Sequence, residues 1–290
     1  MSEAEAIAAA SKSVVGAVGQ IIDIAKENPD ARQAGANLAK TAKVVTEFIS
    51  NLALPLAAGN FVIQRSADYF RHRFADRLAE KLADVDPEDL IEPKPMIAGP
   101  AIEGLNYAHD EPDLEDMFTS LIATAMDKKT ASSAHPAFVH AISQMDPAEA
   151  SLLKTVLRAS FRSRTLAIAE LRTGTKGWTV LERNLLRFTH RDTNEMIVIP
   201  GQSAWVDNWV RLGLVEVDWM SFLSAPDAYE WVKEHPLYLK HAGSNQGIHI
   251  AKGAHNVTDF GVRFARAIRL DKPYAVVVAE SNEAQPSRPE

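Results

Sequence analysis

The chain contains no cysteine among its 290 residues. Disulfide bonds, and zinc or iron–sulfur sites built on cysteine, are therefore excluded. The beginning of the sequence also lacks the basic segment and apolar core that mark a secretion signal. We therefore predict a cytoplasmic protein in a reducing compartment.

Long uninterrupted apolar runs are also missing. The least polar stretch, residues 44–63, has about the 20 residues that a bilayer-spanning helix needs. It nevertheless carries several polar side chains and a proline, Pro55, near its middle. We favour a buried helix interrupted at Pro55, and keep insertion into a membrane as the alternative.

The composition is that of a globular protein, with 46% hydrophobic and 24% charged residues. The net charge of −7 argues against a polycation that seeks nucleic acid. Basic residues are nevertheless concentrated in one region, which holds only two acidic side chains. These basic residues are Arg158, Arg162, Arg164, Arg172, Lys176, Arg183, Arg187 and Arg191.

Helical periodicity dominates the first half of the chain. Apolar residues at helical spacing predict helices over residues 2–27, 33–52 and 61–82. A proline-rich connector, residues 86–100, is expected to form a packed strap, because its prolines prevent a continuous helix. Shorter helices are predicted after it, over residues 101–109, 113–126 and 136–144.

Asp146 begins a different pattern. Asp146 caps a helix, Pro147 takes its first position, and Glu149 completes a capping-box arrangement. The elements expected from there are helices over 148–161, 166–171 and 203–212, a strand over 214–219, strands over 247–250 and 254–257 around a turn at Lys252-Gly253, and a helix over 259–268 capped by Thr258.

This order of elements is typical of a winged helix-turn-helix. We therefore predict a mainly α protein. Its N-terminal helical domain spans residues 1–145, and a winged-helix-like α+β domain with a lengthened wing spans 146–280. Residues 281–290 are expected to form a disordered tail.

Several segments resemble one known family. They are DLIEPKPMIAGPAIEGL from Asp89, HPAFV from His135, QMDPAEASLLK from Gln144, WVRLGLVEV from Trp209 and VTDFGVRF from Val257. With these segments the chain resembles the Abi-alpha (abortive infection alpha) family over roughly residues 61–270. The resemblance implies a bacterial cytoplasmic protein associated with phage defence, and it carries over no catalytic residues.

An acidic cluster in the first half could imitate a metal or acid–base site. It consists of His109, Asp110, Glu111, Asp113, Glu115 and Asp116. Its spacing matches no ligand pattern, so we interpret it as a solvated turn with carboxylates at a helix N-terminus. A metal-dependent nuclease that uses Asp113 or Glu115 stays as an alternative.

Other chemistry-bearing motifs are weak. His135 and His140 flank a helix start, and His135 is expected to bond a backbone group next to Pro136 and not a metal. The sequence has neither a phosphate-binding glycine loop nor a nucleophile elbow. We therefore predict no cofactor and no metal, and lean towards a protein that is not an enzyme.

The basic residues are the candidate binding site. We predict Arg158 and Arg162 on one helix and Arg183, Arg187 and Arg191 on another, where aligned arginines could bind phosphates. Pairing of these arginines with the acidic N-terminal half or with a partner subunit explains them equally well.

The candidate recognition helix, residues 203–212, is expected to read DNA bases poorly. Its candidate readers are Gln202, Ser203, Asn208 and Arg211, beside the repelling Asp207. The leading hypothesis is a non-enzymatic phage-defence effector or sensor that contacts protein or nucleic acid. A nucleic-acid-binding winged-helix protein and a membrane-acting toxin are the alternatives, and a protein partner or homo-oligomer is expected.

Overall fold

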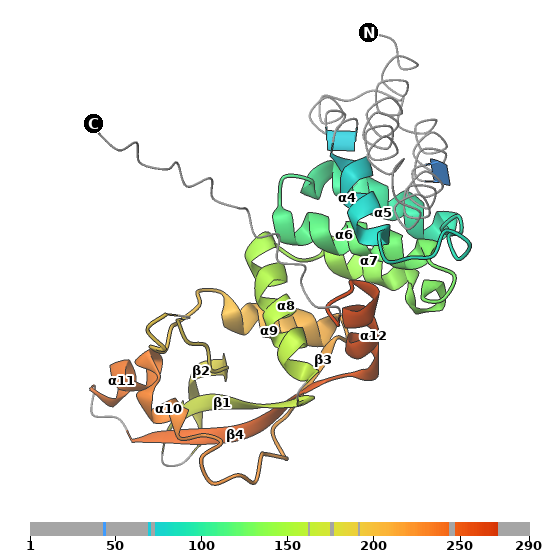
Figure 1. Cartoon of the computed structure of the whole chain (residues 1–290). Helices are drawn as coiled ribbons and strands as arrows, with labels where there is room; N and C mark the ends of the chain where they lie inside the picture. Colours follow the sequence, from blue (N-terminus) through green and yellow to red (C-terminus); the bar gives the residue numbers. More distant parts are fainter. Residues whose placement is uncertain are drawn as a thin grey trace, which may run out of the picture.

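The computed structural model describes residues 43–44, 69–70, 73–161, 163–174, 177–190, 192–243 and 247–271. Over these residues the protein combines nine α-helices with one four-stranded antiparallel sheet, so its fold is mixed α+β (Figure 1). The expected helix over 2–27, all but residues 43–44 of the one over 33–52, and the expected tail 281–290 lie outside the described residues.

The bilayer-length stretch 44–63 also lies outside the described residues, apart from Val44. Within the part of the chain that the structure describes, no helix is both long enough and apolar enough to cross a membrane.

The helical part is built around α6, which is buried along nearly its whole length. The neighbouring helices each present an apolar face to the core. On α4 this face consists of Phe74, Leu78 and Leu82, which recur every four residues and are fully buried. The helices here are α4 (Phe74–Leu82), α5 (Pro95–Ala108), α6 (Pro112–Met126) and α7 (Pro136–Ser143), with a short 3₁₀ helix, η2 (Ala131–Ser133).

The expected helix break at Pro100 is wrong, because α5 begins at Pro95 and continues through Pro100. A proline inside a helix removes one backbone hydrogen bond. The helix persists since Ile97, Ala101 and Leu105 bury one face of it in the core. Only the first part of the proline-rich connector is a strap, where Leu90 forms an isolated bridge with Asp127.

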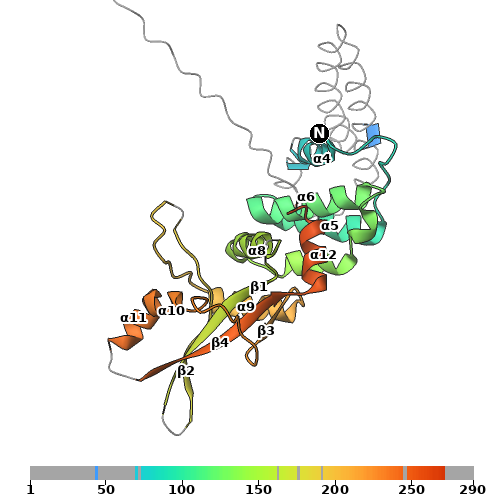
Figure 2. The same cartoon turned by 60° about the horizontal axis from the view of Figure 1, so that its bottom comes forward.

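The second half contains the sheet, whose strand order is β2-β1-β4-β3. Figure 2 shows the β1–β2 hairpin projecting beyond the helices. The strands are β1 (Thr165–Thr173), β2 (Thr179–Leu185), β3 (Val215–Asp218) and β4 (Ile248–Val257). The helices are α8 (Pro147–Ser160), α9 (Gln202–Arg211), α10 (Trp231–Glu234), α11 (Pro236–Ala242) and α12 (Asp259–Ala267).

Two predicted helix starts are confirmed at the level of atoms. The Asp146 carboxylate accepts a hydrogen bond from the Glu149 amide at 2.8 Å, and the Glu149 side chain accepts one from the Asp146 amide. At α12 the Thr258 hydroxyl accepts a hydrogen bond from the Gly261 amide at 2.9 Å. Local capping chemistry therefore fixes where both helices begin.

The helix expected over residues 166–171 is instead the middle of β1. β1 pairs with β2 on one edge and with β4 on the other, and several of its consecutive residues are buried. A strand covered on both faces has an almost continuous apolar sequence, which does not show the alternation of a half-buried strand. This explains why its periodicity was misleading.

The expected turn at Lys252-Gly253 is also wrong, because β4 runs unbroken from Ile248 to Val257 and pairs with β1 throughout. Gly253 instead permits close packing. A Cβ atom at this position would lie 2.7 Å from the ring of Trp219. The glycine is therefore needed for the approach of Trp219 to the sheet, and not for a change of chain direction.

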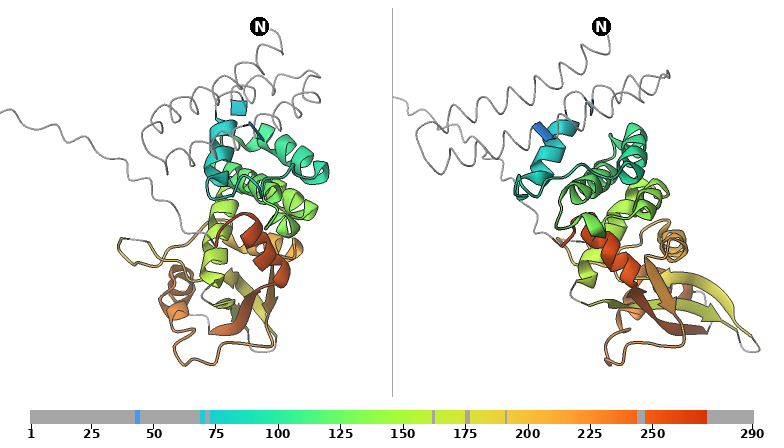
Figure 3. Two further views of the ribbon diagram at one scale, coloured as in Figure 1. Left: turned by 45° about the vertical axis from the view of Figure 1, so that its right-hand side comes forward. Right: turned by 90° about the vertical axis from the view of Figure 1, so that its right-hand side faces the viewer.

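Two apolar clusters form the interior. The larger one joins the helical part to α8, α9 and α12 and to one face of the sheet, while the smaller one lies between the other face and α10. The views in Figure 3 show α12 between the sheet and the helical part. The proposed domain boundary at residue 146 stays a prediction.

Candidate functional site

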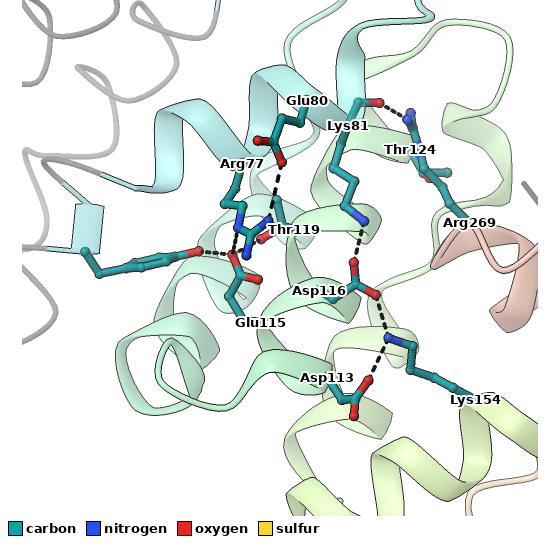
Figure 4. Close-up of polar contacts among 11 residues, drawn as sticks. Arg77, Glu80, Lys81, Asp113, Glu115, Asp116, Thr119, Thr124, Lys154 and Arg269 are labelled. Carbon is teal, nitrogen blue, oxygen red and sulfur yellow. Dashed lines mark hydrogen bonds and ion pairs between the residues drawn. The ribbon is translucent and has the colours of Figure 1, made fainter. Parts of the chain in front are cut away.

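A buried network of charged side chains joins α4, α6 and α8 (Figure 4). At its centre the Lys154 ammonium of α8 lies 2.8 Å from an Asp113 oxygen and 2.7 Å from an Asp116 oxygen. Asp116 uses its other oxygen to accept from Lys81 of α4. Helix formation places Asp113 and Asp116 three positions apart on one side of α6, so both reach the same lysine.

Burial disfavours the charged forms of these side chains unless they are paired. Lys154 is only 1% exposed. Burial by itself lowers the pKa of Lys154, but the charges of Asp116 and Asp113 outweigh it, and the pKa is raised. Burial likewise tends to raise the pKa of Asp116, but Lys154 and Lys81 hold it below its usual value. Both groups therefore stay ionised at neutral pH.

A second set of contacts surrounds Glu115 on the same helix. The Tyr69 hydroxyl donates to Glu115 Oε1 at 2.7 Å, and Arg77 Nε lies 4.0 Å from that oxygen. Burial, followed by the charge of Glu115, raises the pKa of Tyr69 well above its ordinary value. Tyr69 therefore acts here as a hydrogen-bond donor that links the residues before α4 to α6.

The interpretation of the acidic cluster as a solvated turn is wrong for its last members. Asp110 stays largely in solvent, but Glu115 is 7% exposed and Asp113 and Asp116 are paired with lysines. Among the described residues, no group of His, Asp and Glu side chains could hold a metal ion. The carboxylates instead connect helices to one another.

Sequence reasoning missed Lys154, although a signal was present. Ala150, Leu153 and Leu157 form the buried stripe of α8, and Lys154 lies within that stripe. A lysine at such a position requires a buried anionic partner. Asp113 and Asp116, on a helix with its own apolar residues, were the available candidates.

Arg269 closes the network from the C-terminal side. It follows α12 in the left-handed region, with φ of 58°. Its guanidinium donates to the Ala123 carbonyl at 3.0 Å, to the Thr124 hydroxyl at 3.2 Å and to the Lys81 carbonyl. One cation thus caps the C-terminal ends of both α4 and α6, where carbonyl groups lack helical partners.

The histidine predicted to bond a backbone group does so. His135 Nδ1 accepts from the Ala137 amide at 3.1 Å and caps α7 next to Pro136. The same arrangement recurs at α11, where His235 Nδ1 accepts from the Leu237 amide at 3.3 Å. In both cases a histidine followed by proline begins a helix.

The prediction that one helix carries Arg183 and Arg187 is wrong. Arg183 lies on strand β2, and Arg187 lies in the loop after it, so the two do not share a helix. Pairing of β2 with β1 overrides the four-residue spacing on which that helix was predicted. Arg158 is exposed near the end of α8, while Arg162 and Arg191 lie outside the described residues.

Several polar side chains of helix α9 form hydrogen bonds within the protein. Gln202 donates to the Asn184 carbonyl at 2.8 Å, and Asn208 donates to Glu149 at 2.7 Å and to the Gln144 carbonyl at 3.0 Å. Arg211 donates to Asn208 on the same helix. Trp205 Nε1 donates to Asp146 Oδ2 at 2.9 Å. These bonds attach α9 to the start of α8.

Comparison with protein families gives one finding. The family model described as abortive infection alpha matches residues 66–268, which is most of the chain. Comparison with the curated proteins and with the solved structures gives no match.

Proposed function

The chain belongs to the abortive infection alpha family, and from that premise we propose that it is a bacterial, cytoplasmic, non-enzymatic effector or sensor of phage defence. It acts by contacting a protein or a nucleic acid. The observation that carries this proposal is the role of its ionised side chains. Lys154 of α8 pairs with both Asp113 and Asp116 of α6, so these charges serve to hold helices together.

The C-terminal part is proposed to work as a winged-helix-like contact module. Supporting this, α9 is followed by Gly213 with φ of 73°, then by the antiparallel pair β3–β4 and by α12. The long β4 strand, which continues well past β3, takes the place of the lengthened wing.

Contact through α9 is better suited to a protein surface than to the bases of DNA. A recognition helix needs outward-facing amide or guanidinium groups to read base edges. Gln202, Asn208 and the exposed Arg211 are bonded within the protein. The other exposed positions of α9 are Ala204, Asp207 and Val210. A protein partner, or a second copy of the chain, is therefore the proposed ligand of this helix.

Phage challenge tests the proposed function. Bacteria that express the chain from a plasmid are compared with an empty-vector strain across diverse phages, with plaque counts and culture survival as readouts. We expect fewer plaques for some phages. An abortive mechanism also predicts culture survival at a low ratio of phage to cells and collapse at a high ratio. Unchanged plaque counts across all phages would contradict the proposal.

Nucleic-acid contact is favoured by a separate observation. Arg183 and Arg187 are exposed, and neither has a carboxylate partner among the described residues. Contacts to phosphates predict affinity that falls steeply as salt rises. Fluorescence anisotropy with duplex and single-stranded probes tests this by comparing the wild type with the Arg183→Ala, Arg187→Ala double variant. Equal affinities of the two proteins would show that these arginines do not bind nucleic acid.

A further inference from the structure

One half of a sheet face is only partly covered, because His249 on it is exposed and Arg172 and Ala251 are partly exposed. Residues paired across adjacent strands point to the same face, and Arg172 pairs with both Val180 of β2 and His249 of β4. Glu170 and Ala251 pair on that face one step closer to the helices. The opposite face packs against α10. We call the half face around Arg172, His249 and Ala251 the open sheet face.

Trp178, directly before the first residue of β2, borders the open sheet face. It is 57% exposed, whereas the other four tryptophans of the chain are buried or partly buried. Its ring lies 4.4 Å from the ring of His249, at an interplanar angle of 70°. Exposing so large an apolar ring is unfavourable in a free protein, and this edge-on contact holds it in a defined position.

A second tryptophan, Trp219, borders the open sheet face on the side of the helices. Its ring packs on Gly253 of β4, four residues from His249. At the rise of a strand, four residues span about 13 Å. Ala251 lies between the two rings along β4, and its methyl side chain protrudes little from the sheet. Two separated aromatic rings with a low surface between them can each accept a flat ligand ring.

Two arginines lie on neighbouring strands at this surface, Arg172 on β1 and Arg183 on β2. Arg172 Nε lies 3.1 Å from the nearly buried Glu170, which fixes the guanidinium and leaves its terminal nitrogens without a bond among the described residues. On β2, Arg183 is exposed, while the carboxylate of Glu182 is 2.8 Å from His241. The acidic groups of these strands are thus paired, and cationic groups remain available to a phosphate chain.

We propose that the open sheet face binds single-stranded nucleic acid, with bases stacked on Trp178 and Trp219 and the phosphates near Arg172 and Arg183. A base must be unstacked to reach a flat protein ring, so a single strand fits and a duplex does not. This proposal rests on the proposed function, because it names the nucleic acid that the defence protein would contact.

Fluorescence anisotropy with the full chain tests the proposal. The probes are fluorescein-labelled oligothymidylate and oligouridylate and a DNA duplex, each titrated at low and at high salt. We expect single strands to bind more tightly than the duplex. Trp178→Ala should weaken single-strand binding at least about fivefold, as loss of one base stack does, and Trp178→Phe should restore most of it. Tyr107→Ala, which removes an aromatic ring that is 73% exposed on α5, should bind like the wild type.

Three results would overturn the proposal: no single-strand binding at low salt, equal affinity of the Trp178→Ala variant, or equal affinity for duplex and single strand. Because Trp178 is largely exposed, the variant should keep its melting temperature, and that measurement is made alongside. The plaque assay separates the two proposals. If the protein protects cells from phage but binds no single strand, the binding proposal is wrong and the proposed function stands.

Discussion

His255 shows how a single residue makes the fold sensitive to pH. It is fully buried on β4, and neither ring nitrogen has a hydrogen-bond partner in the part of the chain that the structure describes. Burial lowers the pKa of His255 to about 4. Leu166 and Val217 pair with it on the neighbouring strands, so the ring has apolar residues on both sides. A neutral imidazole tolerates this position, and an imidazolium does not.

This predicts a loss of stability in mild acid. Between about pH 6.5 and the folded pKa of about 4, the unfolded chain binds a proton that the folded chain does not, so stability falls as pH falls. From about pH 7.5 to about pH 5 this amounts to about 2 kcal/mol. In urea unfolding at these two pH values, the free energy of unfolding of His255→Leu should therefore fall by about 2 kcal/mol less than that of the wild type.

Leu121→Ala provides the control for this experiment. It removes a fully buried apolar side chain from α6 and leaves the strands around His255 unchanged, so its cost should be the same at both pH values. A His255→Leu variant that loses as much stability in acid as the wild type would show that His255 does not cause the effect.

Individual elements were predictable where local chemistry decides them. Asp146, Pro147 and Glu149 define the start of α8 in the sequence, and the structure places the start there. The failures occur where distant residues decide. The sequence of β1 does not show that β2 and β4 will cover its two edges, and nothing near Gly253 indicates that Trp219 will pack on it.

Two glycine substitutions test the packing of elements. Gly253→Ala places a methyl group 2.7 Å from the Trp219 ring and 3.1 Å from the Asp218 carbonyl. Overpacking of this kind costs about 1–3 kcal/mol. Gly243→Ala, at the exposed C-terminal end of α11, places its methyl group at ordinary contact distances of 3.7 Å and 3.8 Å from the carbonyl oxygens of Leu239 and Lys240 and should change stability by less than about 0.5 kcal/mol. Equal shifts of the urea midpoint for the two variants would contradict this account.

At the scale of the whole molecule, the charged network joins parts of the chain that are far apart in sequence. Lys81 of α4, Asp116 of α6 and Lys154 of α8 form one chain of contacts. The acidic residues were recognisable in the sequence, but their use was not, because the partner lysines lie 35 and 38 positions away. Spacing along one helix carries no information about such contacts.

Breaking this network should cost more than breaking a surface pair. Lys154→Met leaves Asp113 without a lysine and Asp116 with Lys81 alone. Because both carboxylates keep some contact with solvent, the cost should exceed about 1 kcal/mol and stay below the ~3–5 kcal/mol lost when one partner of a fully buried pair is removed. Lys233→Met removes the surface pair with Glu230, whose side chains are 59% and 63% exposed, and should cost less than about 1 kcal/mol. Equal costs in urea unfolding would show that the network does not stabilise the fold.

Arg269 also has a consequence for how the protein is made. Its bond to the Lys81 carbonyl joins positions 188 residues apart. The ribosome delivers α4 and α6 well before Arg269, the cation that caps their ends. Contacts this distant in sequence form late in folding. The ends of α4 and α6 are therefore capped only after Arg269 has been synthesised, and a messenger cut short before Arg269 would yield a helical part without this cap.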